Sequence, residues 1–369
     1  MPRNTALHID LAAIGDNVAV LRKKLGNRAF MAVIKADAYG HGAAAVATHI
    51  EHQVDAFAVA FTEEAASLRQ TGIRKPILVL EGPHTPSDMA AAIELDLWPV
   101  LHEPNQLEWL KNQAKTLRSV WLKADTGMHR LGFAHTELPS VRDSLKALGV
   151  NNVLAMTHLA SAEQPEDSLT LSQLAHWHNT ATNWPDQTSL CNSAGALMNY
   201  SASCDWARVG YAIYGGKIEN TDTIHLKPAM HFASSVIALR HIRQGDSVGY
   251  SGRWVAPRDS VIATVPAGYG DGYPRTAKDG TPVAINGQLA PLAGTVSMDM
   301  LTVDVTDCSG VELGAAATLW GNSPAVDAVA PHAETIGYEL MTRVTGRPKR
   351  LYYTETAALP LTISGVVND

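Results

Sequence analysis

The chain has 369 residues and a formal net charge of −7, with 46% hydrophobic and 18% charged residues. This length supports two domains with buried cores, and the composition is ordinary for a soluble globular protein. The acidic balance argues against nucleic-acid binding, and no apolar stretch approaches the roughly 20 residues that a membrane helix needs. The three cysteines, Cys191, Cys204 and Cys308, are odd in number and lack metal-ligand spacing. We therefore expect packing roles for them, no metal site and a cytoplasmic location.

Short apolar segments rich in β-forming residues alternate with helical patterns from Ala29 onward. Eight β-α units of this kind close into a TIM-type (β/α)8 barrel, and an open doubly wound sheet is the alternative. Before them, Ala6–Asp10 is compatible with a strand of either domain. Helical spacing is found over 43–52, 62–71, 86–96, 104–115 and 136–148. The expected strands are Ala29–Ile34, Ala56–Phe61, Ile77–Leu80, Trp98–Leu101, Ser119–Ala124, Val153–Thr157, Gln187–Leu190 and Trp206–Val209.

The pattern changes after Tyr214 to short strands separated by Gly, Pro and Asp turns, such as Asp279-Gly280 and Asn286-Gly287. This pattern predicts a second, mostly β domain. A polar break at residues 220–222 suggests a boundary between Gly215 and Pro228. We therefore expect a barrel over residues 1–225 and a β domain over residues 226–369.

Lys35 directly follows the first apolar strand, which puts its amine at the mouth of a barrel, where Schiff-base lysines act. The alternative is an exposed lysine that only caps a buried strand. Tyr39-Gly40-His41-Gly42 then forms the loop to the next helix. Glycines in such a loop allow backbone amides to approach a bound anion.

Polar residues also follow later strands, at the barrel end where catalytic groups lie. Lys123 and Asp125 follow the fifth strand, and His158 follows the sixth. A histidine at a strand end is often only a hydrogen-bonded structural group.

The last two strands are followed by Asn192-Ser193 and by Gly210-Tyr211, and phosphate sites of such barrels use these loops. Ser193 and the Gly210-Tyr211 backbone, with Lys35 opposite, can hold a phosphorylated carbonyl cofactor. Arg208 needs an acceptor, which is either a structural carboxylate or a ligand atom.

Eight motifs occur in order along the chain: Ala32–Gly42, Lys123–Gly132, Thr157–Ala160, Asn192–Ala194, Arg208–Gly215, Val248–Tyr250, Gly268–Arg275 and Gly294–Asp299. In this order they resemble alanine racemase, the fold-type III family of pyridoxal-phosphate enzymes, over nearly the whole chain. The resemblance implies covalently bound pyridoxal 5′-phosphate and D-alanine synthesis for peptidoglycan. It also implies a head-to-tail homodimer, in which Tyr250 and Met298 of one subunit complete the partner's active site.

Racemisation removes a weakly acidic Cα proton and returns one to the opposite face, so it needs an electron sink and two acid–base groups. The resemblance assigns Lys35 to one face, as the lysine that binds the cofactor, and Tyr250 to the other. It places His158 between Tyr250 and Arg208. The resemblance also implies that Arg208 hydrogen-bonds the pyridine nitrogen of the cofactor. Because the guanidinium keeps its proton, the cofactor ring is then a weaker electron sink, and side reactions such as transamination are suppressed.

The resemblance also implies the remaining contacts. Tyr39, Ser193 and the amides of Gly210 and Tyr211 hold the phosphate. Substrate contacts are implied for Arg130, Met298, Asp299 and Tyr269, with Arg130 also touching the cofactor's phenolic oxygen. Lys123 matches a position that is carbamylated in some members, and a plain lysine is the alternative. Tyr269 matches a residue of the narrow substrate access, although packing is an equally ordinary role for a tyrosine in a turn.

One position departs from the family pattern. Some members carry a tyrosine near the chain's end that crowds the substrate pocket, and Gly346 stands at the matching position. A smaller residue would loosen the pocket, so we expect serine to be accepted alongside alanine.

Three other interpretations are weaker. An amino-acid decarboxylase with the same cofactor fold pairs the pyridine nitrogen with a carboxylate, whereas the match here is Arg208. A non-catalytic carrier like the small single-barrel relatives would have neither a β domain nor Tyr250. The segment Gly268–Gly272 resembles the glycine-rich motif of dinucleotide-binding domains, but no helical pattern follows it, as that motif requires.

Overall fold

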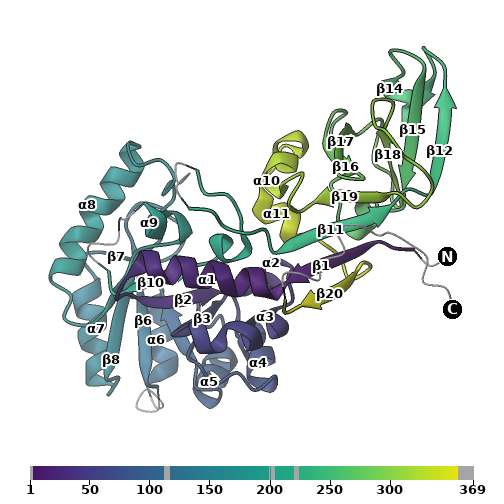
Figure 1. Cartoon of the computed structure of the whole chain (residues 1–369). Coiled ribbons are helices and arrows are strands. Elements are labelled where there is room, and N and C mark those ends of the chain that lie inside the picture. The colour runs from purple at the N-terminus through teal and green to yellow at the C-terminus, as the bar shows by residue number, and fades with distance from the viewer. Residues whose placement is uncertain (1–2, 112–116, 199, 201–203, 220–223, 356–369) are drawn as a thin grey trace.

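The computed structural model of the protein describes residues 3–111, 117–198, 200, 204–219 and 224–355. Figure 1 shows a closed barrel surrounded by helices and a mostly β part that extends away from it. The hydrophobic core is continuous through both parts, from Phe30 in the barrel to Trp320 in the β part. The architecture is the expected barrel with a second, mostly β domain.

Eight parallel strands form the barrel. They are β2 (Ala29–Val33), β3 (Ala56–Val59), β4 (Ile77–Val79), β5 (Trp98–Leu101), β6 (Ser119–Asp125), β8 (Asn152–Met156), β9 (Thr188–Ser189) and β10 (Trp206–Val209). The pairing of β5 with β6 closes the ring, which rules out the open doubly wound sheet. A two-residue strand, β7 (Phe133–Ala134), also pairs with β6. Strands β3 and β4 are buried along their whole length, as expected where helices cover a parallel sheet.

The helices begin at ordinary capping signals. Thr85 and Asp88 form a capping box around Pro86, and Asp167 caps the long helix that follows it. The helix expected over 104–115 ends at Leu110, and residues 112–115 lie outside the described part of the chain. The helices are α1 (Leu11–Leu25), α2 (Lys35–Tyr39), α3 (Ala43–Ile50), α4 (Thr62–Gln70), α5 (Pro86–Glu94), α6 (Pro104–Leu110), α7 (Leu138–Ala147), α8 (Ser168–Thr182), α9 (Ser193–Leu197), α10 (Val326–Val329) and α11 (Gly337–Thr342). The short 3₁₀ turns are η1 (Glu51–Gln53), η4 (Tyr211–Tyr214), η5 (Tyr250–Gly252), η6 (Tyr269–Asp271) and η7 (Ala330–Ala333).

The β part is built on a six-stranded sheet. The strands of the whole β part are β1 (Ala6–Asp10), β11 (Met230–Ser235), β12 (Ala238–Ile242), β13 (Ser247–Val248), β14 (Trp254–Val255), β15 (Ser260–Val265), β16 (Pro282–Ile285), β17 (Gln288–Pro291), β18 (Leu301–Asp304), β19 (Ala316–Trp320) and β20 (Lys349–Tyr353). Smaller sheets of three strands (β12-β15-β18) and two strands (β13-β14) complete this part. The order of the six-stranded sheet is β17-β16-β19-β11-β1-β20. Since β1 lies between β11 and β20, Ala6–Asp10 is a strand of this sheet and not of the barrel. The polar break at residues 220–222 lies outside the described residues, which resume at Ile224.

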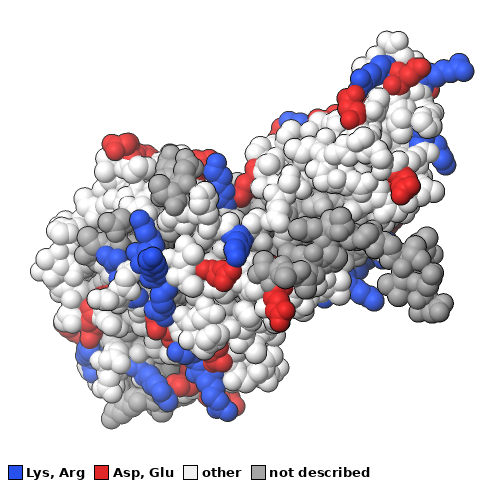
Figure 2. Space-filling model, viewed as in Figure 1, with Lys and Arg blue, Asp and Glu red and all other residues white. Residues whose placement is uncertain are grey.

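The surface carries charges of both signs. Figure 2 shows Lys and Arg interspersed with Asp and Glu on this face, without a continuous basic surface. In the part of the chain that the structure describes, every helix is too short or too polar to cross a membrane.

Candidate active site

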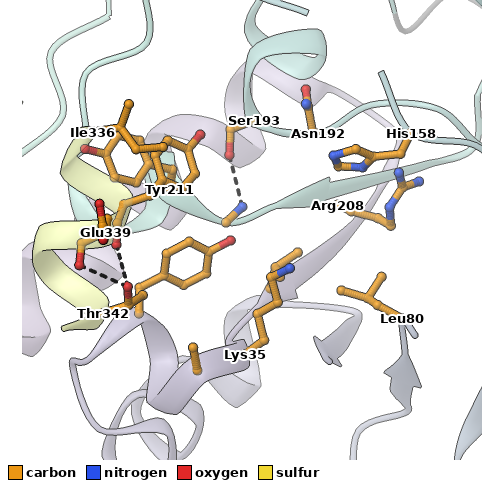
Figure 3. A pocket seen from close by; sticks show the side chains of 15 residues that line it. Lys35, Leu80, His158, Asn192, Ser193, Arg208, Tyr211, Ile336, Glu339 and Thr342 are labelled. Carbon is orange, nitrogen blue, oxygen red and sulfur yellow. Dashed lines mark hydrogen bonds between the residues drawn. The ribbon is translucent and has the colours of Figure 1, made fainter. Parts of the chain in front are cut away.

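A cavity of about 450 Å³ lies at the carboxyl ends of the barrel strands. Figure 3 shows Lys35 extending into it between two groups, with Ser193 and Tyr211 on one side and His158 and Arg208 on the other. The strand ends therefore converge on one space, as expected for a TIM-type barrel. Seven residues singled out from the sequence line the cavity: Lys35, Tyr39, His158, Ser193, Arg208, Gly210 and Tyr211.

Lys35 opens a turn, α2, whose backbone is left-handed. Ala36, Asp37 and Ala38 have φ angles of 51°, 54° and 54°, and Tyr39 has a φ angle of 52°. This conformation costs an L-residue roughly 1–2 kcal/mol. Such strain is kept only where surrounding groups hold it, and it is concentrated at functional sites.

The two glycines after this turn serve close packing. A Cβ at Gly40 would lie 2.2 Å from the Met341 carbonyl oxygen, and a Cβ at Gly42 would lie 2.0 Å from the Tyr352 hydroxyl. Their N–H groups donate to carbonyls inside the same turn. The expectation that these two amides approach an anion is therefore wrong.

Two hydroxyl groups line one side of the cavity. Ser193 Oγ accepts a hydrogen bond of 3.0 Å from the Gly210 N–H, which fixes the position of the oxygen. The Tyr39 hydroxyl lies so close to Gly210 that a Cβ there would be 2.5 Å from it. Burial raises the pKa of Tyr39 to about 12, so this phenol keeps its proton and can donate it in a hydrogen bond.

Arg208 occupies the other side and is only 3% exposed. Its guanidinium donates to Ser189 Oγ at 2.5 Å and to the Thr157 carbonyl at 2.6 Å. Among the described residues no carboxylate pairs with Arg208, so the structural-carboxylate alternative has no support. Burial lowers the pKa of Arg208 to about 10, which still leaves it charged at neutral pH.

His158 lies beside Arg208 in the cavity wall (Figure 3). Burial, followed by the positive charges of Arg208 and Lys123, lowers the pKa of His158 to about 3. The imidazole is therefore neutral near pH 7. One ring nitrogen can then donate a hydrogen bond while the other accepts one.

Lys123 and Arg130 lie outside the lining of the cavity. Lys123 is 6% exposed within β6, and burial lowers its pKa to about 8. Arg130 is exposed, and its charge also lowers the pKa of Lys123. The Asp125 carboxylate shapes the loop to Arg130 by accepting hydrogen bonds from the Gly127 and His129 N–H groups at 3.0 and 3.1 Å.

The candidates in the β part lie away from this cavity. Tyr250 is 68% exposed and Met298 is 53% exposed, and Tyr269 and Asp299 are also exposed. None of the four lines the cavity of its own chain. The structure thus brings together the barrel candidates and leaves the β-part candidates on the surface.

An ion-pair network nevertheless holds these surface segments in place. Arg347 donates two hydrogen bonds of 2.7 Å to the buried Asp271 carboxylate, one of 2.7 Å to Asp299 and one of 3.1 Å to the Met298 carbonyl. Arg3 pairs with the same Asp271. The surface around Met298 is therefore preformed.

Helix α11 and the residue before it form a wall of the cavity that sequence analysis missed. Ile336, Tyr338, Glu339 and Thr342 line the cavity. Tyr338 stacks on Tyr211, with ring centroids 3.7 Å apart and an interplanar angle of 8°. No local sequence signal marks this contact, because it joins two segments only in three dimensions.

The cysteines are consistent with packing roles. Cys191 and Cys204 are buried with their sulfur atoms 3.6 Å apart, and Cys308 is half-buried. All three are free thiols.

Comparisons with known proteins agree with this geometry. The model for the N-terminal domain of alanine racemase matches residues 9–218, and the model for its C-terminal domain matches residues 229–352. The chain is 45% identical to the alanine racemase of Pseudoalteromonas atlantica, over 96% of this chain and 100% of the relative.

Solved structures show the same relationship. The biosynthetic alanine racemase of Pseudomonas aeruginosa superposes with a TM-score of 0.90 at 41% identity, over 95% of this chain and 99% of that one. The alanine racemase of Bartonella henselae, solved with covalently bound pyridoxal phosphate, gives a TM-score of 0.87 at 28% identity, over 95% and 100% of the two chains. With the barrel, the β domain and the convergent strand-end residues, these matches establish that the chain is a member of the alanine racemase family.

Proposed function

We propose that this protein interconverts L-alanine and D-alanine, with pyridoxal 5′-phosphate bound covalently to Lys35, and so supplies D-alanine for peptidoglycan precursors. The observation that carries the proposal is the convergence of Lys35, Tyr39, Ser193 and Arg208 on one cavity. The names of its relatives support the reaction. The cysteine pattern and the family support a cytoplasmic location.

The residues present fit this cofactor. Gly210 leaves room where a side chain would meet the Tyr39 hydroxyl, so the Tyr39 and Ser193 hydroxyls and the Tyr211 amide can approach a phosphate together. The Gly210 N–H donates to Ser193 Oγ in this structure and would join them once that hydroxyl turns toward the phosphate. Arg208 lies on the opposite side of Lys35, where it can meet a ring nitrogen (Figure 3). Bound there, pyridoxal phosphate would act as the electron sink that makes the substrate's Cα proton removable.

The chain's own groups would then move the proton. Once the amino group of the substrate has displaced it from the cofactor, the free Lys35 amine would take or return the Cα proton on one face. The Tyr250 phenol of the partner subunit would do so on the other. Arg208 keeps its proton, because its pKa of about 10 lies well above neutral pH, and so donates a hydrogen bond without protonating the ring nitrogen. His158, held neutral, can link Tyr250 to Arg208 by accepting a hydrogen bond from Arg208 and donating one to the Tyr250 oxygen.

A homodimer with shared active sites explains the exposed half of the candidate site. Tyr250, Met298, Asp299 and Tyr269 lie outside their own chain's cavity, so they can act only on another subunit's cavity. The domain over residues 226–369 would thus contribute Tyr250 and Met298 to the partner's site, while its α11 lines the cavity of its own chain. Arg130 would hold the substrate carboxylate from the barrel side.

Lys123 is proposed to be carbamylated. Its pKa of about 8 makes a fraction of the amine uncharged near neutral pH, and only the uncharged amine attacks carbon dioxide. The resulting carboxylate would offset the charge of Arg130. Intact mass spectra with and without bicarbonate should differ by one carboxyl group in the wild type and not in Lys123→Gln.

Gly346 supports the acceptance of serine. Gly346 is exposed and does not itself line the cavity, and a Cβ at this position would meet no atom within 4 Å, so a larger side chain has room there. A chiral assay of both amino acids tests this, and strict preference for alanine would contradict it.

The decisive experiment for the proposed function is borohydride reduction of the cofactor-loaded protein, followed by peptide mapping. The cofactor should be found on the peptide that contains Lys35. Attachment at any other lysine would refute the proposal.

A decarboxylase is disfavoured because Arg208 occupies the position where those enzymes use a carboxylate.

A further inference from the structure

The left-handed turn at Lys35 depends on a carboxylate from a neighbouring β-α unit. Glu64 lies in the first turn of α4, and its Oε1 atom accepts a hydrogen bond of 2.7 Å from the Ala36 N–H. Its Oε2 atom accepts hydrogen bonds of 2.7 and 3.2 Å from the Ala60 and Phe61 N–H groups. One carboxylate therefore joins the end of β3 and the start of α4 to the peptide group that follows Lys35.

Other groups hold the far end of the same turn. His41 Nδ1 donates to the Ala38 and Tyr39 carbonyls at 2.9 and 3.0 Å. Arg350 donates to the Gly40 carbonyl at 2.9 Å and lies 3.4 Å from the Asp37 carboxylate. Near Lys35 itself, Glu64 is the side chain that bonds the backbone of the turn.

We infer that Glu64 is a positioning residue for Lys35: by holding the Ala36 N–H it keeps the turn left-handed, so that the Lys35 amine and the Tyr39 hydroxyl face the same cavity. The turn's conformation is unfavourable for its four non-glycine residues, so it needs such a support. A carboxylate is suited to this role, because its two oxygens accept from both sides at once. The inference rests on the proposed covalent role of Lys35.

Glu64→Gln separates this role from helix capping. The amide keeps one acceptor oxygen, which can cap α4 at Ala60 and Phe61, while its NH₂ group would face the Ala36 N–H. Glu63→Gln is the matched control, since it removes the same charge from an exposed side chain of the same helix turn. Ala66→Gly is the second control, because it weakens α4 without removing an acceptor.

The first measurement is amide hydrogen exchange in the full-length protein without added cofactor. Glu64→Gln should accelerate exchange of the peptide that covers residues 35–40 by roughly ten-fold or more, as expected for the loss of a charge-assisted hydrogen bond. Glu63→Gln should leave this peptide unchanged, and Ala66→Gly should affect only α4. Equal protection in Glu64→Gln and Glu63→Gln would overturn the inference.

The second measurement is the dissociation constant for pyridoxal phosphate, from absorbance titration of the same proteins. We expect it to rise roughly ten-fold in Glu64→Gln and to stay near the wild-type value in both controls. A rise in Ala66→Gly as large as in Glu64→Gln would show a general effect of helix stability and refute a specific role. Failure of the wild type to bind at Lys35 would instead refute the proposed function, so the two failures are distinguishable.

Discussion

The barrel and the β part present their candidate functional groups in opposite ways. The barrel gathers Lys35, His158 and Arg208 inside one cavity, where burial shifts the pKa values of His158 and Arg208. The β part displays Tyr250 and Met298 on its surface, although an ion-pair network holds the loop around Met298. The barrel thus gathers most of a binding site, to which α11 of the β part adds a wall, whereas Tyr250 and Met298 stand on a preformed surface outside that cavity.

The largest expected effect tests the barrel half. Lys35→Ala removes the group proposed to bind the cofactor and to act as one base, so racemisation should fall on the order of 10⁴-fold or more. A coupled D-alanine assay and the absorbance of bound cofactor measure the two losses. Lys24→Ala, on the exposed end of α1, is the control and should behave like the wild type.

A subunit-mixing experiment tests directly whether Tyr250 of one chain acts on the barrel cavity of another chain. Tyr250→Phe alone should slow the enzyme about 10²- to 10³-fold, because it removes one acid–base group. Refolding an equal mixture of Lys35→Ala and Tyr250→Phe chains should restore roughly a quarter of wild-type activity, because about half of the dimers are mixed and each has one intact site. No restoration would mean that Tyr250 does not act on a partner's cavity.

The junction between the two parts should respond to acid. Burial lowers the pKa of His41 from 6.5 to about 4, and the ring stacks on Tyr214, with Arg350 and His231 also disfavouring its protonation. Between these two pKa values, the His41 imidazole is therefore protonated in the unfolded chain and neutral in the folded chain. The free energy of unfolding should fall by roughly 1.4 kcal/mol per pH unit as the pH drops from about 6.5 to about 4.

Denaturant titrations across this pH range measure the slope. His41→Asn should be less stable than the wild type at pH 7.5, because it loses the stacking on Tyr214, although its NH₂ group can still donate to the Ala38 and Tyr39 carbonyls. It should also show a shallower slope, because Asn does not titrate. A parallel curve would show that His41 does not contribute to acid sensitivity.

The smallest expected effect concerns specificity. Gly346→Tyr should lower kcat/KM for serine relative to alanine by roughly ten-fold, since a larger side chain would narrow the pocket. Because the space around Gly346 is open, the variant should unfold at nearly the wild-type denaturant midpoint. An unchanged ratio of kcat/KM for serine to kcat/KM for alanine would show that Gly346 does not determine substrate specificity.

Much of this molecule follows from local patterns. The eight apolar segments predict the barrel strands because each is short and rich in β-forming residues, and the first five are followed by helical patterns. The Asn286-Gly287 pair likewise predicts the β16–β17 hairpin, and both residues have positive φ. Strand-end positions then identify the cavity, because a barrel brings those ends together.

Other features depend on contacts that no local pattern encodes. The left-handed α2 turn runs through Ala36 and Ala38, which have no preference for that conformation, and Glu64 and Arg350 hold it from distant segments. The α11 wall depends on the stacking of Tyr338 on Tyr211. The packing role of Gly40 and Gly42 is hidden for the same reason, since the atoms that exclude a side chain there belong to Met341 and Tyr352.

The placement of β1 has a consequence for the order of folding during synthesis. β1 is made before the barrel strands, yet its two neighbours, β11 and β20, are made after them. Barrel strands mostly pair with strands next to them in sequence, so this part can assemble while the rest is still being translated. Ala6–Asp10 must therefore stay unpaired while the barrel is made, and the six-stranded sheet is complete only after β20 has followed.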